Sequence, residues 1–290
     1  MVLAAALSSA LVAGCSVPAV PAESQIEEVI AATATYDYGQ SSKRLRDVER
    51  LIRETHGHAD RRACLERQLV KLLESDATTA AKQFVCRQLW IIGTDASVPE
   101  LGKMLLDEKT AEMACYALGR HPSPAVGRVL REALAKARGK ARVPIINLLG
   151  DRRDAQSVPA LAKLTGSPEM TVSDAAVAAL GKIATDQAAK LLADLRKSDD
   201  AKRRAAATHA YLQCARGLAA RNRSAEAKVI YEQLTDLSEP VHIRRGAFLG
   251  RVALGGPEAV SLVISTLRGK DDALKPTAIA SIRTLCIKEK

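Results

Sequence analysis

Apolar residues in the central and C-terminal parts of the chain recur at or near the i, i+3, i+4 and i+7 spacing of one helix face. Two examples of this stripe are Val98, Leu101 and Leu105, and Val158, Leu161 and Leu164. No run of alternating β-branched residues is bounded by Asn-Gly or Asp-Gly, the dipeptides typical of tight hairpins. The pattern therefore predicts an all-α fold.

A Leu-Gly step recurs along this region at a nearly constant interval. Gly119, Gly150 and Gly181 are equally spaced, and the interval from Gly181 to Gly250 is slightly longer than two of these units. Gly93, which follows Ile92, precedes them with the same downstream pattern. We expect each glycine to end a helix in the left-handed conformation, and a polar residue of the next turn to cap the following helix. Helix pairs this short cannot bury their apolar faces alone, so neighbouring pairs must stack.

These units resemble HEAT repeats, especially the short type of phycobilin-lyase-like and related bacterial proteins. The resemblance rests on the Ala-Leu-Gly motifs at 117–119 and 179–181 and the Val-Pro-x-Leu motifs at 98–101 and 158–161. It covers roughly residues 77–285 and implies a right-handed α-solenoid of about six to eight helix pairs, with a concave groove lined by the second helix of each pair. Because this superfamily has many functions, the resemblance specifies architecture and not activity.

Two regions depart from the repeat. Residues 23–76 contain two charged helical segments and fit an atypical N-terminal capping pair before the solenoid of residues 77–290. Residues 208–241 have the spacing of a single tetratricopeptide-type unit, whose longer helices would explain the long interval between Gly181 and Gly250. An elongated HEAT unit explains that interval equally well.

Residues 1–22 have features of an export signal. Residues 2–13 are apolar and too short to span a bilayer. Val12-Ala13-Gly14-Cys15 resembles a bacterial lipobox, which makes Cys15 a lipidation candidate, and Val20-Pro21-Ala22 offers ordinary cleavage. No Lys or Arg precedes the apolar stretch, as a signal normally requires, so an apolar N-terminal helix is the alternative. We predict an exported protein, secreted or in the cell envelope or periplasm, with a membrane link only through a lipid.

The formal net charge of +10 is compatible with an acidic partner, nucleic acid or an anionic membrane surface. A solvated, mildly basic surface explains it better, because the basic residues are spread along the chain and not gathered in one tail. The residue after each Leu-Gly step is Arg120, Asp151, Lys182 or Arg251, and stacking would align these positions. The three cations are candidates for a partner surface, although a helix dipole also favours a cation near a helix C-terminus. Nucleic acid is the less favoured partner, because Asp151 interrupts the stripe and because export would separate the protein from nucleic acid.

Two arginine pairs each follow an acidic turn. Asp199-Asp200 precede Arg203-Arg204, and Glu239 precedes Arg244-Arg245, as in HEAT families. We expect these four arginines to hydrogen-bond the acidic turns of the preceding repeat and to hold neighbouring layers in register.

No catalytic motif is present. The chain lacks a GxSxG elbow, an HExxH helix, a phosphate-binding glycine loop, a CxxC pair, and the His-Glu dipeptide that iron-dependent HEAT hydroxylases use as metal ligands. His56-Gly57-His58 followed by Asp60 could hold a metal, but a polar turn between helices also explains them. We therefore predict a non-catalytic protein-interaction scaffold without a cofactor or metal. Nucleic-acid binding is the main alternative, and a lyase-like enzyme on a HEAT scaffold is supported by analogy alone.

Overall fold

The computed structural model describes residues 23–288, and every regular element in this range is helical. The α-helices are α1 (Glu23–Ala31), α2 (Lys43–Glu54), α3 (Ala59–Glu74), α4 (Thr79–Ile92), α5 (Val98–Met104), α6 (Ala111–Leu118), α7 (Ala125–Lys136), α8 (Arg142–Asp151), α9 (Val158–Leu164), α10 (Met170–Ile183), α11 (Asp186–Leu195), α12 (Ala201–Ala219), α13 (Ser224–Gln233), α14 (Val241–Leu254), α15 (Gly256–Arg268) and α16 (Lys275–Lys288). Short 3-10 helices η1 (Gly139–Ala141) and η2 (Ala155–Ser157) precede α8 and α9. The predicted all-α fold is confirmed. None of the helices in the described range is long and apolar enough to cross a bilayer.

The chain divides into two compact units, with the boundary between Lys82 and Gln83. In the described part of the first unit, α1 packs against α2 and α3, and α2 packs against α3. Val48 and Leu65 are completely buried among these helices. The turn before α4 is fixed to the turn after α1, because the Thr78 backbone N–H donates to the Ala34 carbonyl at 3.0 Å.

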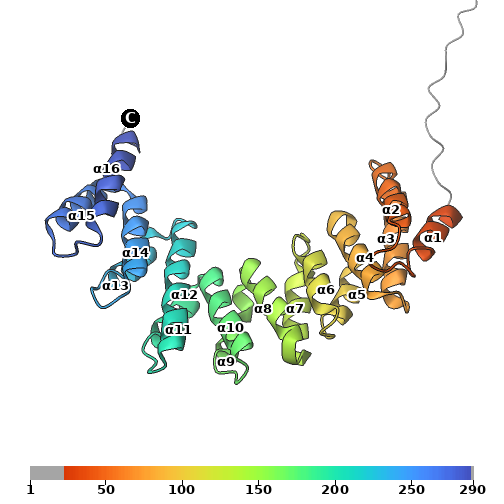
Figure 1. The fold of residues 1–290 in the computed structure, drawn as a ribbon, viewed down its shortest axis with the longest axis horizontal. Helices are drawn as coiled ribbons and strands as arrows, with labels where there is room; N and C mark the ends of the chain where they lie inside the picture. The colour runs from red at the N-terminus through yellow and green to blue at the C-terminus, as the bar shows by residue number, and fades with distance from the viewer. Residues whose placement is uncertain (1–22, 289–290) are drawn as a thin grey trace, which may run out of the picture. The chain divides into compact units, whose positions relative to one another are not determined.

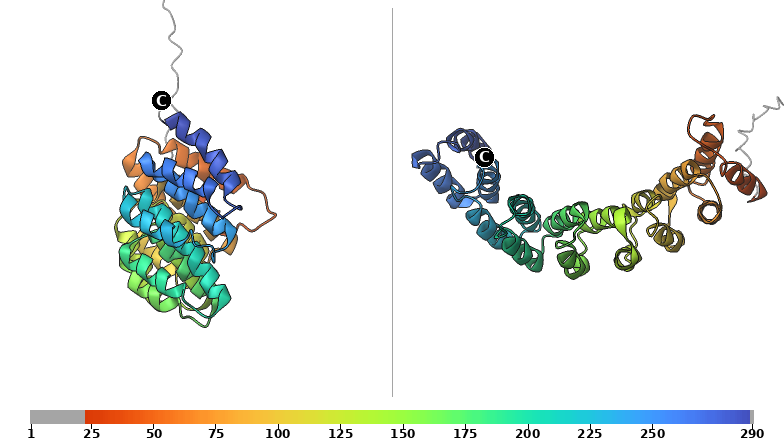
Figure 2. Two further views of the ribbon diagram at one scale, coloured as in Figure 1. Left: turned by 90° about the vertical axis from the view of Figure 1, so that its left-hand side faces the viewer. Right: turned by 60° about the horizontal axis from the view of Figure 1, so that its bottom comes forward.

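The second unit is an α-solenoid built from successive helix pairs (Figure 1). From α6 to α16, each even-numbered helix packs against the next even-numbered helix. The odd-numbered helices form a second row, in which α5 contacts α7 and α9 contacts α11 (Figure 2). Chain order and spatial order therefore agree within this unit, as the repeat predicts.

Gly119 is the C-cap of α6 in right-handed conformation and Gly250 lies inside α14, so the prediction that these glycines end helices in the left-handed conformation was wrong. Gly150 and Gly181 lie inside α8 and α10, and positive φ angles occur further along the chain, at Arg153 (53°) and Ala184 (51°). A Cβ on Gly150 would lie 2.9 Å from the Ala179 Cα of the neighbouring even-numbered helix. These two glycines therefore allow neighbouring helices to approach closely, instead of ending their own helix.

The polar turns after the glycine steps cap the next element in two of three cases. Thr185 accepts from the Ala188 N–H at 3.2 Å and caps α11, and Asp154 accepts from the Ser157 N–H at 3.2 Å at η2. Ser97 precedes α5 without a capping bond from its side chain. The long interval between Gly181 and Gly250 contains α12, which has 19 residues, followed by α13 with 10.

Candidate interaction surface

One helix position is exposed on successive even-numbered helices of the second unit. Its occupants, which recur at similar intervals along the chain, are Trp90, Tyr116, Asn147, Ala178, His209 and His242. We call this set the exposed ladder. Ring contacts between α4 and α6 and between α12 and α14 join neighbouring members at its two ends. The ladder therefore follows the row of even-numbered helices and is open to solvent.

The N-terminal end of the exposed ladder is aromatic. The rings of Trp90 and Tyr116 stack with centroids 5.9 Å apart, although the two residues are 36% and 50% exposed. The Arg120 guanidinium lies 5.2 Å from the Trp90 ring centroid, within the range of a cation–π contact. Rigid amphipathic rings beside an arginine are the residue types that most often anchor protein interfaces.

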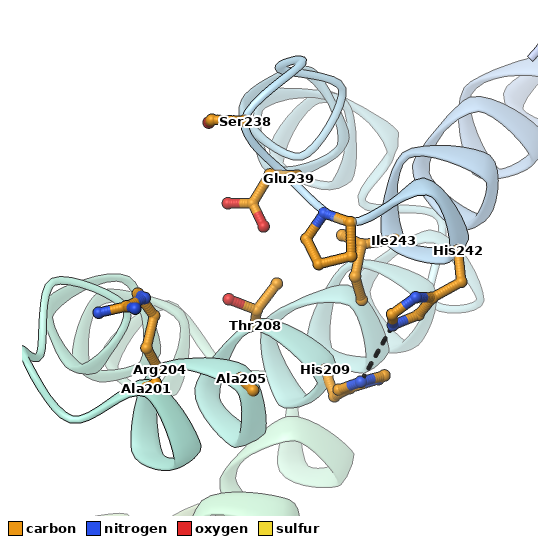
Figure 3. A pocket seen from close by; sticks show the side chains of 10 residues that line it. Ala201, Arg204, Ala205, Thr208, His209, Ser238, Glu239, His242 and Ile243 are labelled. Carbon is orange, nitrogen blue, oxygen red and sulfur yellow. Dashed lines mark hydrogen bonds between the residues drawn. The ribbon is translucent and has the colours of Figure 1, made fainter. Parts of the chain in front are cut away.

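The C-terminal end of the exposed ladder is a histidine pair beside a pocket of about 460 Å³ between α12 and α14 (Figure 3). His209 and His242 stack with ring centroids 5.0 Å apart and an interplanar angle of 22°, and their Nε2 atoms are 3.2 Å apart. The other residues that line this pocket are Ala201, Arg204, Ala205, Thr208, Ser238, Glu239, Pro240 and Ile243.

The three predicted partner-surface cations each have a partner within the second unit. Arg120 lies over Trp90, the Lys182 ammonium is 2.7 Å from Asp151, and Arg251 Nη2 is 3.5 Å from Glu232 Oε1. Asp151, which interrupts the predicted basic stripe, thus neutralises one of its members.

Of the first predicted arginine pair, one residue bonds to the preceding repeat and the other to the turn before its own helix. Arg203 Nη2 donates to the Thr165 carbonyl at 3.0 Å, in the preceding repeat, and Arg204 Nη1 donates to the Ser198 carbonyl at 2.7 Å, in its own turn. The Asp200 carboxylate caps α12 by accepting from the backbone N–H groups of Lys202 and Arg203. These hydrogen bonds hold the pKa of Asp200 below its usual value.

In the second pair, Arg244 is buried and reaches forward to the following repeat. Its Nε and Nη2 atoms donate to the two carboxylate oxygens of Asp271 at 2.8 and 3.0 Å, and Nη1 donates to the Glu239 carbonyl at 2.5 Å. The hydrogen bond from Arg244 lowers the pKa of Asp271. Arg245 is exposed and lines a pocket of about 410 Å³ between α14 and α16.

Two further arginines join neighbouring repeats and were missed by the sequence analysis. Arg152, after α8, donates to the His121 carbonyl beyond α6 at 2.9 Å, and Arg221, after α12, donates to the Ala184 and Ile183 carbonyls at the end of α10 at 2.9 and 2.8 Å. Desolvation lowers the pKa of both guanidinium groups. Some of the chain's many arginines therefore serve to hydrogen-bond backbone carbonyl groups near helix ends that have no partner within the helix.

Four cysteines of the described chain belong to the hydrophobic core. Cys64, Cys86, Cys115 and Cys214 are buried and form no disulfide. Burial raises the pKa of Cys115 and of Cys214 to about 12, so both stay thiols at neutral pH and pack as small apolar groups. Cys15 lies outside the described residues.

The turn with His56 and His58 exposes both side chains to solvent. Among residues 23–288, no three or more His, Cys, Asp and Glu side chains are grouped so as to hold a metal ion.

A match to a protein family supports the repeat architecture. Residues 129–212, from α7 into α12, match the family of HEAT repeats. Among solved structures, the crystal structure of an engineered protein is similar at 19% identity and a TM-score of 0.43, covering 90% of this chain and 78% of that one. Human deoxyhypusine hydroxylase in complex with glycerol is similar at 12% identity and a TM-score of 0.32, covering 91% and 96%. No curated protein matches significantly. Structural similarity at these identities and TM-scores gives no information about activity.

Proposed function

We propose that this protein is a non-catalytic scaffold that binds a partner protein along the exposed ladder. HEAT repeats commonly mediate protein interactions, and the observation that carries the proposal is the exposed stack of Trp90, Tyr116 and Arg120. Leu89, next to Trp90 in the sequence, and Leu118, between Tyr116 and Arg120, are buried in the core beneath the stack. The contacts of Trp90 with Tyr116 and with Arg120 would order these side chains before a partner binds, which would limit the entropy lost on binding.

The partner is expected to present an acidic surface with apolar residues at its centre. Residues 83–290 contain 33 Lys and Arg but only 22 Asp and Glu, a net charge of +11, whereas the rest of the chain is close to neutral. A charge excess of this kind raises the association rate with an acidic partner. The aromatic rings would supply most of the affinity.

Trp90→Ala and Tyr116→Ala are each expected to weaken partner binding at least tenfold, because each removes a ring from the stack. A photo-crosslinking amino acid introduced at Tyr116 would first identify the partner by mass spectrometry, in cell-envelope extracts. The affinity of that partner for each variant would then be measured by calorimetry. Val229→Ala is the matched control, since Val229 is an apolar residue, 53% exposed, on α13 in the odd-numbered row.

The scaffold proposal fails if crosslinking from position 116 recovers no protein above the level seen from position 229. It also fails if Val229→Ala weakens binding as much as the two ring variants do. Recovery of nucleic acid instead, with salt-sensitive binding weakened by charge reversal of Arg120, Lys182 and Arg251, would support the alternative function.

We also propose that the protein acts outside the cytoplasm, either secreted or attached to the envelope through Cys15. This proposal is supported by the apolar stretch and the lipobox-like tetrapeptide within residues 1–22. Mass spectrometry of the mature N-terminus from cells is expected to find a diacylglyceryl-modified Cys15 or, after ordinary cleavage, Glu23. An intact, unmodified N-terminus that begins at Met1 would contradict export.

A further inference from the structure

The structure points to a second site on the exposed ladder. We propose that His209 and His242 together bind one divalent transition-metal ion of the zinc, nickel and copper class through their Nε2 atoms. The two residues belong to adjacent even-numbered helices, α12 and α14, and lie 33 positions apart in the chain. A bound ion would therefore crosslink two neighbouring repeats.

The separation of the two nitrogen atoms fits a shared ion. At a metal–nitrogen distance of about 2.0–2.1 Å, two ligands of one ion are about 2.9 Å apart for a right angle at the metal and about 3.4 Å apart for a tetrahedral angle. The Nε2 atoms of His209 and His242 are 3.2 Å apart, between these two values.

Without a metal, the two rings form a stacked, hydrogen-bonded pair. Their centroids are 5.0 Å apart with planes 22° from parallel, and the 3.2 Å contact between the Nε2 atoms is a hydrogen bond that one ring donates to the other (Figure 3). A shared ion would take the place of this proton. The rings would then turn so that both carry their proton on Nδ1 and direct the Nε2 lone pair at the metal.

The surroundings of the pair leave room for an ion and its other ligands. Both imidazoles are exposed, and Figure 3 shows the Arg204 side chain directed away from them. The Arg204 guanidinium is held by the Ser198 carbonyl, and the Glu239 carboxylate is 2.5 Å from Arg196 Nη2. The chain thus supplies two ligands, and water or a group from a docked partner would complete the coordination.

The donor set determines which ions would bind. Two neutral imidazoles and water suit nickel, copper and zinc, whereas calcium and magnesium require oxygen ligands. Affinity should follow the general order for nitrogen sites, with Cu²⁺ above Ni²⁺ and Zn²⁺.

The test is a calorimetric titration of the full chain with Zn²⁺, Ni²⁺ and, separately, Mg²⁺, after removal of metals with a chelator. One Zn²⁺ or Ni²⁺ per chain is expected, and none of Mg²⁺. His209→Gln and His242→Gln should each weaken Zn²⁺ binding at least tenfold, because the remaining imidazole cannot chelate. The Cu²⁺ complex should show two coordinated imidazole nitrogens by electron paramagnetic resonance.

The double variant His56→Gln, His58→Gln is the matched control, since it removes the other exposed histidine pair of the described chain. It should bind Zn²⁺ as the wild type does, and circular dichroism should show that every variant keeps its helices. The proposal is overturned if the wild type binds no transition metal, if His209→Gln and His242→Gln bind as tightly as the wild type, or if only the control loses binding. These outcomes do not depend on whether a protein binds at Trp90 and Tyr116.

Discussion

Asp271→Asn is expected to lower the free energy of unfolding by about 3 kcal/mol, because it leaves the Arg244 guanidinium buried without a counter-charge. The side chains of Arg244 and Asp271 are only 9% and 16% exposed, and two hydrogen bonds join them across the last repeats. An asparagine can replace at most one of the two accepting oxygens. Urea denaturation at neutral pH, followed by circular dichroism, measures the loss.

The effect should depend on pH in a defined direction. Since Arg244 lowers the pKa of Asp271, the folded protein binds a proton at this carboxylate more weakly than the unfolded chain does. The stabilisation is therefore complete above the unfolded pKa of about 3.9, and it is lost as the pH falls through the lower folded value. The difference between wild type and Asp271→Asn should shrink below about pH 4.

Asp272→Asn is the control at the next residue. Asp272 is 85% exposed and pairs only with Lys275, three positions along, so the change should alter stability by less than about 0.5 kcal/mol. Equal losses for Asp271→Asn and Asp272→Asn would mean that the Arg244 pair does not join the last repeats.

The sequence predicted the repeated helix pairs because hydrophobic spacing and chain order are enough to define a stack of short helices. Contacts between repeats were harder to predict, since their partners come from turns whose lengths vary. Arg244 donates to the Glu239 carbonyl of the preceding acidic turn, as expected, but its carboxylate partner is Asp271 in the following turn. No local sequence pattern near Arg244 indicates that its carboxylate partner lies later in the chain.

The spacing of the repeats predicts part of the histidine pair's geometry. The interval from Ala178 to His209 equals the interval from Gly150 to Gly181, whereas the interval from His209 to His242 is slightly longer. Aligning the repeats would have placed the two histidines on adjacent helices. Their separation of 3.2 Å depends on how closely α12 and α14 approach, which spacing in sequence does not specify.

Gly181 shows why a glycine after leucine was misinterpreted. The same dipeptide suits a left-handed helix end, where glycine avoids steric strain, and a helix crossing, where glycine has no Cβ to clash. Only the residue on the neighbouring helix decides between these roles. At Gly181 that neighbour is the Ala210 backbone of α12.

Gly181→Ala is accordingly expected to destabilise the protein by about 1–3 kcal/mol, the usual cost of overpacking a core. In an open helix the same substitution would stabilise by about 0.5–1 kcal/mol, so the two explanations predict opposite signs. The new Cβ would lie 2.6 Å from the Ala210 carbonyl oxygen and 3.0 Å from its Cα. These are backbone atoms, and no side-chain rotation can relieve the contact, so α10 and α12 would have to move apart.

Gly166→Ala provides the comparison. Gly166 is exposed in the turn after α9, and the nearest neighbour of an added Cβ would be the Lys163 carbonyl oxygen at 3.7 Å, an ordinary contact. The free energy of unfolding of the Gly166→Ala variant should differ from the wild type by less than about 0.5 kcal/mol, in urea denaturation measured alongside Gly181→Ala. A gain in stability for Gly181→Ala would show that α10 and α12 are not packed closely enough to need glycine, and the role assigned to the Leu-Gly step would then be wrong.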